Sequence, residues 1–536
     1  MTKHKNEIPV SELSAEALDA LITRVQEAID NDLSLSTEDL KLLLNAVLTL
    51  ATMQERLSNK DITTHKLCKL LGIVQSSEKL THLLAEGSTA KPDTKIKRTR
   101  KPKDKKAPEP TKVHHALEGF YKGQSCPACL SGKLYKYEPA QLLRVSGHSP
   151  FCSELHLSER LRCNACGQFF TASLPDDVLA DGEVGQKYAY SARSLMALQK
   201  YFAGAPFYRQ ESLQDILGLS ITASTIFDQC EYLSNDLYPI FKQLLVIAAD
   251  AHHFYLDDTT HRIIEQETIQ KKKRNSNKLQ TRTGLYASGI IASIEQQNEQ
   301  QNIVLFQTNI GHAGEFIDEI LKKRKPDKSP PILMSDALPS NNPTGMPALH
   351  AACNSHSRRQ FVDVIHQFPD EVEWVLQCYK QIWQFEDETI GQAMSPAKRL
   401  KYHQENSLPV MNEIRAWGIK HFTDNTVEEN SSLGKAIAYF NRHFERLILF
   451  CKIEGAKIDN NLMEQALKLI VRNRKNAYFY KTPAGAAISD VITSLIATAM
   501  QAGINVFDYF NVIQRHSQAV KEQPEKWLPW NYVENA

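Results

Sequence analysis

The sequence predicts a multidomain α/β protein, in which a helical N-terminal region, a cysteine-rich segment and a helical domain precede a mixed α/β core. Three observations support this class. Short apolar runs typical of strands gather between residues 246 and 361, and helix-forming segments occupy most of the chain before and after them. Two Cys-x-x-Cys pairs lie ahead of both.

Length and composition limit the classes of protein that fit. A chain of 536 residues is too long for one core, so three or more domains are expected. The formal net charge of +1 gives no overall sign of a nucleic-acid partner. No apolar run reaches the ~18–20 residues of a membrane span, and the first ten residues lack the apolar segment of a secretory signal. We therefore expect a cytoplasmic chain with reduced cysteines, no membrane contact, and paired cysteines that bind metal rather than form disulfides.

Two helices are predicted near the start of the chain, within residues 1–86. Ser36 followed by Asp39 is a typical N-cap signal for the second helix. This pattern fits a short helical hairpin or coiled-coil seam for self-association, and it fits equally a small bundle packed on its own chain. The apolar positions are Leu18, Ile22, Val25, Ile29, Leu43, Val47, Leu50 and Leu57.

Residues 87–112 predict a basic, disordered linker. Between Lys91 and Lys106 there are nine Lys or Arg residues against two Asp, with almost no apolar side chains, so no core can form. Such an arm can neutralise phosphates without reading sequence, and we favour this over a solvated tether with no partner. The cations expected to contact DNA are Lys97, Arg98, Arg100 and Lys101.

Residues 113–175 predict a zinc ribbon. Each Cys-x-x-Cys pair supplies two thiolates from one tight turn, and 33 residues separate the pairs. Cys152 inside that spacer is an alternative ligand. A closed site of four thiolates is structural, so this Zn²⁺ performs no chemistry. The four predicted ligands are Cys126, Cys129, Cys163 and Cys166.

Residues 185–245 predict a helical domain of helix-turn-helix type. The segment Tyr208–Leu219 leads through Gly218 into a second helix at Ile221–Phe227. Small polar residues open that second helix and could reach a DNA groove or phosphates. Helical hairpins that bind nothing look similar, but we favour DNA binding here.

A strand pattern follows, in residues 246–361. Three strands, a helix, a strand and a further short apolar run, completed by a late helix that bears an acid, is the order of a ribonuclease H-like fold. The predicted elements are the strands Phe254–Leu256, Gly284–Ile294 and Ile303–Gln307, the helix Ala313–Lys323, the strand Ile332–Met334 and the run Ala348–Ala352. We expect a helical insertion at 362–455, the acid-bearing helix of the core at 456–500 and a C-terminal tail at 501–536.

Three carboxylates fall where that fold places catalytic acids: Asp257 on the first strand, Asp336 after the fourth, and Glu464 on the late helix. Two divalent ions about 3.5–4 Å apart can activate a nucleophile and stabilise the leaving oxygen of a phosphodiester. Mg²⁺ or Mn²⁺ prefers oxygen ligands. Asp257 would then bridge both ions, Asp336 hold one and Glu464 the other, whereas Asp258 points to the opposite face. Taken singly, each acid would be an N-cap, a turn residue or a surface charge.

Cys353 and His356 have the spacing of a metal-binding pair. No completing pair is evident, so packing and hydrogen bonding are favoured over a second zinc site. Cations near the acids are interpreted as phosphate contacts, with ordinary surface charge as the alternative. These cations are Arg358, Arg359, Lys468, Arg474 and Lys475.

With these motifs in hand, the chain resembles the insertion sequence 66 family of bacterial DDE transposases. Asp257-Asp258-Thr259 resembles the family's Asp-Glu-Thr signature, and Asp336 falls at its second aspartate. The most specific match is Asp459-Asn460-Asn461 with Glu464, followed by Arg474-Lys475-Asn476. Further matches are Ser77-Glu78-Lys79-Leu80, the two cysteine pairs, the stretch from Cys353 to Phe361, and Leu528-Pro529-Trp530.

The chain departs from the family pattern in four places, none of which removes a catalytic carboxylate. Asp258 replaces a glutamate, and the segment Ser335–Pro339 lacks the tyrosines usual after the second aspartate. Gln465 stands where an arginine is common. A basic insertion, Lys271–Arg282, separates the first two strands.

The resemblance implies a transposase that binds the terminal inverted repeats of a mobile element, cuts at its ends and joins the 3′ ends to target DNA, using an Asp-Asp-Glu triad with Mg²⁺ or Mn²⁺. It also implies a homodimer or larger synaptic complex, accessory proteins encoded by the element, and a place at the bacterial nucleoid. One alternative is a transposase-derived DNA-binding protein that no longer cuts. A weaker one is a nuclease acting on RNA or hybrids.

Overall fold

The computed structural model describes residues 21, 23–28, 31, 35–42, 121–125, 127, 133–134, 149–162, 169–183, 185–267, 269–272, 279–282, 285–296, 299–343 and 345–535. The chain divides into two compact units, of which one is Ala85–Cys152 and the other combines Met1–Leu84 with Ser153–Ala536. The predicted linker and all four predicted zinc ligands lie outside the described residues.

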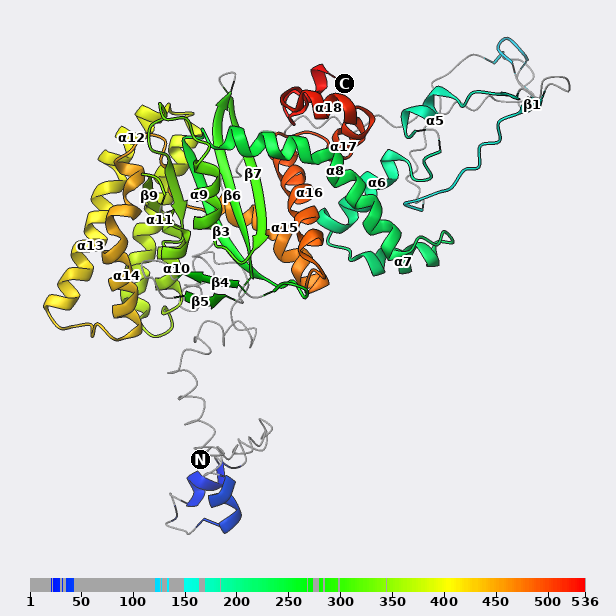
Figure 1. Ribbon diagram of the computed structural model, residues 1–536. Coiled ribbons are helices and arrows are strands. Elements are labelled where there is room, and N and C mark those ends of the chain that lie inside the picture. Colours follow the sequence, from blue (N-terminus) through cyan, green and yellow to red (C-terminus); the bar gives the residue numbers. More distant parts are fainter. Residues whose placement is uncertain are drawn as a thin grey trace. The chain divides into compact units, whose positions relative to one another are not determined.

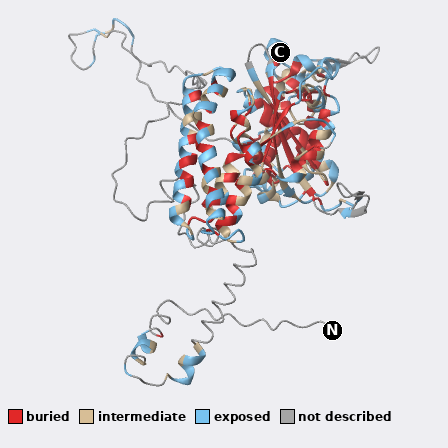
Figure 2. Cartoon of the chain, turned by 90° about the vertical axis from the view of Figure 1, so that its left-hand side faces the viewer, coloured by how far each residue is buried: buried red, intermediate tan, exposed pale blue. Residues whose placement is uncertain are grey.

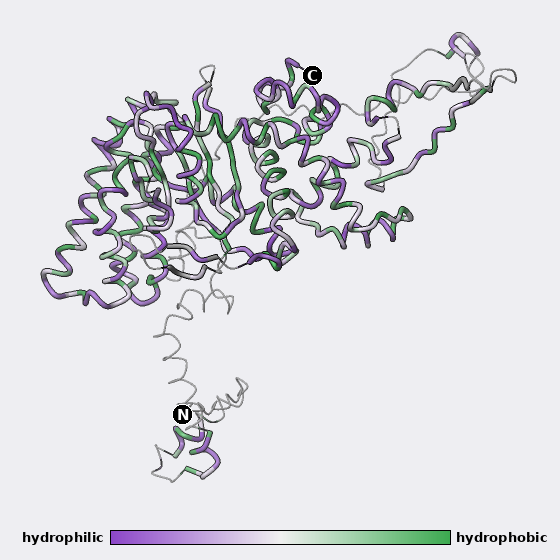
Figure 3. Tube along the Cα trace, viewed as in Figure 1, coloured by the Kyte–Doolittle hydropathy of each residue, from purple (hydrophilic) through white to green (hydrophobic). Residues whose placement is uncertain are grey.

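A mixed sheet forms the centre of the larger unit (Figure 1). Among the described residues it contains five strands, in the order β7-β6-β3-β8-β9. β3 is antiparallel to β6, which is antiparallel to β7, whereas β3, β8 and β9 run parallel. Hydrophobic residues gather on these strands (Figure 3). Their bounds are β3 His253–His261, β6 Leu285–Gln296, β7 Glu299–Asn309, β8 Ile332–Ser335 and β9 Leu349–Ala352.

All five predicted strand segments are confirmed, but β3 is much longer than its apolar run. After Leu256 the strand continues through polar residues to His261, which pairs with Leu285 of β6. The apolar pattern stops at Leu256 because the remaining side chains, from Asp257 onward, are only partly buried or exposed. Cross-strand pairing, and not hydrophobicity, extends this strand. The predicted basic insertion forms a separate hairpin of β4 (Ile269–Lys272) and β5 (Leu279–Arg282).

Helix α16 (Pro483–Gln501) protects one edge of the sheet. An edge strand such as β7 leaves backbone N–H groups without a strand partner. Here three side chains of α16, each one helical turn from the next, accept hydrogen bonds from alternate residues of β7. The donor and acceptor pairs are Val304 with Thr498 (3.0 Å), Phe306 with Ser494 (2.9 Å) and Thr308 with Asp490 (2.6 Å).

The same helix is, of those described, the one that is long and apolar enough to cross a membrane by length and composition. However, 72% of its apolar window is buried inside the protein. This helix contains no long uninterrupted apolar run in the sequence, because Ser, Thr and Asp interrupt it. Those polar residues are the ones that bind β7, so α16 is a core helix.

Further helices cover the sheet. α15 (Asn461–Ala477) packs on β3 and β6, and α9 (Ala313–Leu321) also contacts both strands. The long α8 (Ala223–Ala248) packs on α16. α10 (Asn354–Val362) follows β9 directly. The predicted helix after the third strand and the predicted acid-bearing helix are both confirmed.

A helical layer occupies the region predicted as an insertion, beside β9 (Figure 1). Its buried residues face inward and its exposed residues face solvent (Figure 2). Inside the layer, Glu386 accepts hydrogen bonds from Arg399 and His403, which ties two helices together. The helices are α11 Pro369–Gly391, α12 Pro396–Glu405, α13 Ser407–Thr423 and α14 Ser432–Leu447, followed by the short turn η3 Leu449–Cys451.

The region predicted to be helical ahead of the core is helical, and it packs with the C-terminal segment. The Gln514 side chain donates to the Tyr190 carbonyl at 3.1 Å, joining the last helices to the first of this group. Gly218 has φ +87°, a left-handed conformation that suits glycine, between α7 and α8. The bounds are α5 Asp176–Ala180, α6 Tyr190–Ala197, η1 Leu198–Phe202, α7 Phe207–Ile216, α17 Val506–Arg515 and α18 Ser517–Glu522. Short turns are η2 Pro339–Asn341, η4 Pro524–Trp527 and η5 Tyr532–Glu534.

Of the predicted N-terminal helices, residues 23–28 and 37–42 are described and helical. The predicted N-cap is confirmed, since the Asp39 N–H donates to Ser36 Oγ at 3.1 Å. Arg24 pairs with Asp39 at 2.8 Å. Of the predicted seam positions, Val25 is described, and the others lie outside the described residues.

Candidate active site

The first candidate acid, Asp257, lies in the middle of β3 and faces α15. Its cross-strand partner on β6 is Gly289. A Cβ atom added at Gly289 would lie 2.3 Å from Met463 Cε and 3.3 Å from Leu467 Cδ2, both on α15. Directly paired residues of an antiparallel ladder project to the same face. Asp257 therefore projects toward α15, and glycine at position 289 leaves the room that the helix needs.

The second acid, Asp336, is brought beside Asp257 by the parallel pairing of β3 and β8. The last pair in that register is Tyr255 with Met334, and each acid follows its member of the pair by two residues. Side chains two residues apart on a strand share a face. Asp257 thus lies on β3, and Asp336 lies directly after the end of the neighbouring strand β8, at the matching position.

Hydrogen bonds fix the loop that carries Asp336. Its Oδ1 accepts from the Leu338 N–H at 3.1 Å and from Asn341 Nδ2 at 2.8 Å. Ala337 has φ +68°, a left-handed conformation that turns the chain sharply after the acid. The Tyr439 hydroxyl, from the helical insertion, donates to the Asp336 carbonyl at 3.1 Å. The insertion therefore braces this loop.

The third acid, Glu464, lies in the first turn of α15. The start of this helix is anchored by Asn460, which is fully buried. Its Nδ2 donates to the Leu256 carbonyl at 2.9 Å, directly before Asp257. The sequence analysis singled out this asparagine as part of a motif but did not predict the anchoring contact. The contact sets the helix start, and with it Glu464, against the strand that carries the first acid.

Electrostatics support the convergence of the three acids. The pKa of Asp257 is raised to about 7, mainly by burial and in smaller part by the charges of Asp336 and Glu464, against a hydrogen bond from the Asp258 N–H. Within the described part of the chain, neither Asp257 nor Asp336 forms an ion pair with Lys or Arg. Uncompensated carboxylates that share a site are a common feature of functional centres.

Asp258 points to the face of the strand opposite Asp257, as the sequence analysis expected. Its Oδ1 accepts from Ser288 Oγ at 2.7 Å and from the Ala313 N–H at 2.9 Å, and its Oδ2 lies 2.9 Å from His312 Nδ1. Asp258 therefore holds the start of α9 on the opposite face of the strand.

Arg474, predicted as a phosphate contact, binds protein groups at the end of β3. Its guanidinium donates to Thr259 Oγ1 at 2.8 Å and to Thr260 Oγ1 at 3.0 Å, and it also donates to the Thr260 carbonyl. Lys468 and Lys475 lie exposed on the same helix, and Arg358 and Arg359 are partly buried on α10. The basic side chains of α15 therefore divide between fastening the helix and facing solvent.

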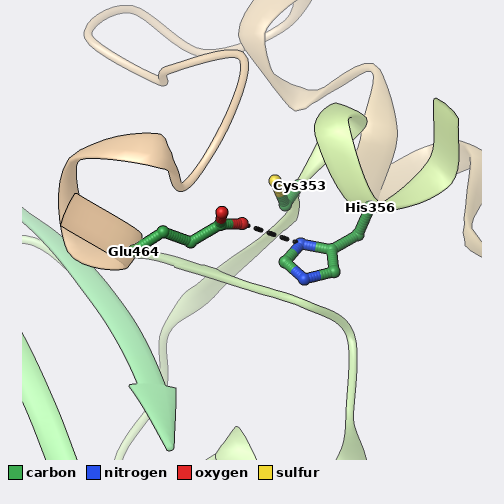
Figure 4. Close-up of side chains that lie close together, drawn as sticks. All are labelled: Cys353, His356 and Glu464. Carbon is green, nitrogen blue, oxygen red and sulfur yellow. Dashed lines mark ion pairs between the residues drawn. The ribbon is translucent and has the colours of Figure 1, made fainter. Parts of the chain in front are cut away.

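Glu464 also meets a pair of residues that the sequence analysis left without a partner (Figure 4). Cys353 Sγ, His356 Nδ1 and a Glu464 carboxylate oxygen all lie within 4.8 Å of one another. His356 Nδ1 is 3.7 Å from Glu464 Oε1. The third member was missed because it lies more than a hundred residues further along the chain.

The residues that flank the predicted zinc ligands form two antiparallel pairings, each described here within its own unit. Ser125 bridges Lys133 around the first cysteine pair. Strand β1 (Arg160–Arg162) pairs with β2 (Phe169–Thr171) around the second. The ligands Cys126, Cys129, Cys163 and Cys166, and the linker residues Lys97, Arg98, Arg100 and Lys101, lie outside the described residues.

A family model described as "Transposase IS66 family" matches residues 187–488, which is more than half of the chain. Three proteins of Sinorhizobium fredii (strain NBRC 101917 / NGR234), whose names assign no function, are similar to it. y4jD is 30% identical over 187 residues, covering 34% of this chain and 36% of that protein. y4hP is 22% identical over 70% of this chain and 67% of its own length, and y4qI is 22% identical over 64% and 62%. The match thus spans about a third of y4jD.

Proposed function

The chain belongs to the IS66 family of transposases, and from that premise we propose that it is a DNA transposase that cuts the ends of an insertion element and joins them to target DNA. Asp257, Asp336 and Glu464 form its catalytic triad. The order of the sheet, with three antiparallel strands beside two parallel ones, supports a ribonuclease H-like core.

One observation supports the proposal: Asp257 on β3 and Asp336 just after β8 lie at matching positions of parallel neighbours, and Glu464 lies in the first turn of the helix that packs on the Asp257 face of the sheet. The charges of Asp336 and Glu464 add to the burial that raises the pKa of Asp257, which supports a shared site. Three acids that converge from distant parts of the chain repel one another, so their convergence does not stabilise the fold.

The donor set fits Mg²⁺ or Mn²⁺. Its members are carboxylates without a Lys or Arg partner in the described part of the chain, and hard divalent cations prefer oxygen ligands. When bound, such ions lower the pKa of an attacking water or 3′-hydroxyl and stabilise the leaving oxygen. Asp257 lies between the other two acids in the proposed arrangement. The Leu338 and Asn341 donors orient Asp336, and the first turn of α15 orients Glu464.

DNA contacts are proposed for the cations near these acids and for the segments ahead of the core. Lys468 and Lys475 are exposed on α15, where they can neutralise phosphates. The basic linker, α7 and the start of α8 are proposed to bind the element ends. A zinc ribbon is proposed for the two cysteine pairs, and the antiparallel pairing on either side of each pair supports it. A homodimer or larger complex would hold two ends together, with accessory proteins of the element as further candidates.

The test is Mn²⁺-dependent nicking of duplex DNA that carries the inverted repeats flanking the gene. Wild type is expected to nick at the repeat ends, and Asp257→Asn, Asp336→Asn and Glu464→Gln are expected to bind the same DNA without cutting it. Glu445→Gln is the matched control, because Glu445 is an exposed acid that pairs with Lys452 on the insertion.

Two outcomes would replace the proposal. Wild type that binds the ends and never cleaves, under any divalent metal, would indicate a transposase-derived binding protein. Cleavage of RNA–DNA hybrid in preference to duplex DNA would indicate a ribonuclease H-like nuclease.

A further inference from the structure

We propose that Cys353, His356 and Glu464 form a binding site for a soft divalent cation of the Zn²⁺ class, which shares Glu464 with the carboxylate site. The sulfur, nitrogen and oxygen ligand atoms lie within 4.8 Å of one another, and His356 Nδ1 is 3.7 Å from Glu464 Oε1, so small side-chain movements would close them around one ion (Figure 4). Three protein ligands with one open position is an arrangement that zinc commonly takes.

Two of the ligand atoms lack the partners that buried polar atoms need. His356 Nδ1 and Glu464 Oε1 are buried and make no hydrogen bond, and they lie 3.7 Å apart, too far for one to satisfy the other. An unpaired buried polar atom costs about 1–3 kcal/mol in proteins. A cation between the two atoms would satisfy both.

The environment of Cys353 suits a thiolate ligand. Its Sγ accepts the Asn460 N–H at 3.2 Å and also a backbone hydrogen bond from His356. Cys353 is the N-cap residue of α10, where the helix dipole favours negative charge. Burial nevertheless raises the pKa of the thiol to about 12. Cation binding must therefore form an S–metal bond while the S–H proton leaves to solvent.

The ligands come from two helix starts that the sequence analysis singled out, the Cys353–Phe361 stretch and the Asp459–Glu464 motif. Cys353 and His356 come from the first turn of α10, and Glu464 comes from the first turn of α15. Asn460 joins them, because its N–H binds Cys353 while its side chain binds the Leu256 carbonyl on β3. One buried asparagine thus positions both the sulfur ligand and the helix that carries the shared glutamate.

The donor set separates this site from the carboxylate site. A thiolate with an imidazole selects zinc-like ions, whereas carboxylates alone select Mg²⁺ or Mn²⁺. A zinc-class ion at Cys353 and His356 that binds Glu464 Oε1 would withdraw that oxygen from the carboxylate site, and this consequence rests on the proposed function.

The binding test uses the full-length chain and zinc itself. Metal-free protein is titrated with Zn²⁺ against a chromophoric chelator, and bound equivalents are counted. Cys353→Ser and His356→Ala are each expected to bind one equivalent fewer than wild type, since the other cysteine ligands are unchanged. Cys378→Ser is the matched control, a buried cysteine on α11 outside the cluster, and it is expected to bind the wild-type number.

Equal zinc stoichiometry in wild type, Cys353→Ser and His356→Ala would overturn the site. His356→Ala keeps the test decisive if the buried Cys353 cannot be replaced without unfolding, because the His356 side chain is 23% exposed. Thermal unfolding of each metal-free variant checks that its fold is retained.

A second measurement tests the shared glutamate. Added Zn²⁺ is expected to lower the rate of Mn²⁺-dependent cleavage by wild type. The same Zn²⁺ concentrations are expected not to change the cleavage rate of His356→Ala from the rate that this variant shows without zinc. Equal inhibition of both proteins would contradict competition for Glu464. If the variants bind less zinc than wild type but no protein cleaves DNA, the zinc site is supported and the proposed function fails. If wild type cleaves DNA but all proteins bind the same amount of zinc, the proposed function is supported and the zinc site fails.

Discussion

Two buried aspartates in this protein have the same raised pKa but different surroundings. Burial raises the pKa of Asp490, on α16, to about 7, and both of its oxygens accept hydrogen bonds from Thr308. Burial also raises the pKa of Asp257 to about 7, but Asp257 accepts one backbone bond and lies near two further carboxyls. The first acid is satisfied by the edge of the sheet that it protects. The second accepts one backbone hydrogen bond and lies near two further carboxyls, and this difference in surroundings distinguishes a candidate site from a structural contact.

The largest expected effect separates activity from stability at Asp257. Asp257→Asn should reduce metal-dependent cleavage at least about 100-fold, because a metal ligand supplies several kcal/mol of transition-state stabilisation. Its melting temperature should stay equal or rise, since a repelled charge is removed. Asp490→Asn should leave cleavage unchanged. A large loss of cleavage in Asp490→Asn and none in Asp257→Asn would reverse the roles assigned to the two acids.

The next effect tests the space opposite Asp257. Gly289→Ala places a methyl group 2.3 Å from Met463 Cε, so α15 must shift or Met463 must change rotamer. Overpacking of this kind costs about 1–3 kcal/mol, and a shift of α15 moves Glu464 as well. Both the melting temperature and the cleavage rate should fall, and Met463→Ala in the same chain should restore part of each.

Gly391→Ala is the control for this substitution, because no atom lies within 4 Å of a Cβ at that position. Its melting temperature should not fall. A Gly289→Ala protein that is as stable and active as wild type would show that α15 does not depend on that gap.

A third effect tests the protected edge. Asp490→Ala removes the acceptor for both the Thr308 N–H and its hydroxyl, and leaving buried donors unpaired costs about 1–3 kcal/mol. Denaturant unfolding should report this loss with the slope unchanged. Asp490→Asn should lose less, since its amide can still accept from the N–H and donate to the hydroxyl.

The last effect is a pH dependence. The folded state raises the pKa of Asp490 from 3.8 to about 7, so it binds a proton more tightly than the unfolded chain does. The free energy of unfolding should therefore fall as pH rises from about 4 to about 7, and change no further from this group above that range. Asp490→Asn should flatten this part of the slope in metal-free protein. An unchanged slope would mean that other groups produce it.

Local pattern predicted most of the elements of the core. Strands β3, β6, β7, β8 and β9, the helix α9 and the acid-bearing helix α15 are visible in sequence because hydrophobic periodicity reflects burial within a few residues of each position. Their order was sufficient to select Asp257, Asp336 and Glu464. The predicted zinc ligands and linker cations remain predictions, since those positions lie outside the described residues.

The sequence by itself determined which residue types occur on which element, because propensity, apolar spacing and motif spacing are properties of neighbouring residues. Only the tertiary structure decided how distant elements meet. The pairing of Asp257 with Gly289, the closing of the β7 edge by α16, the fastening of Arg474 to β3 and the meeting of Glu464 with Cys353 and His356 each join segments far apart in the chain. Such contacts depend on sheet register and helix placement, which no local pattern encodes.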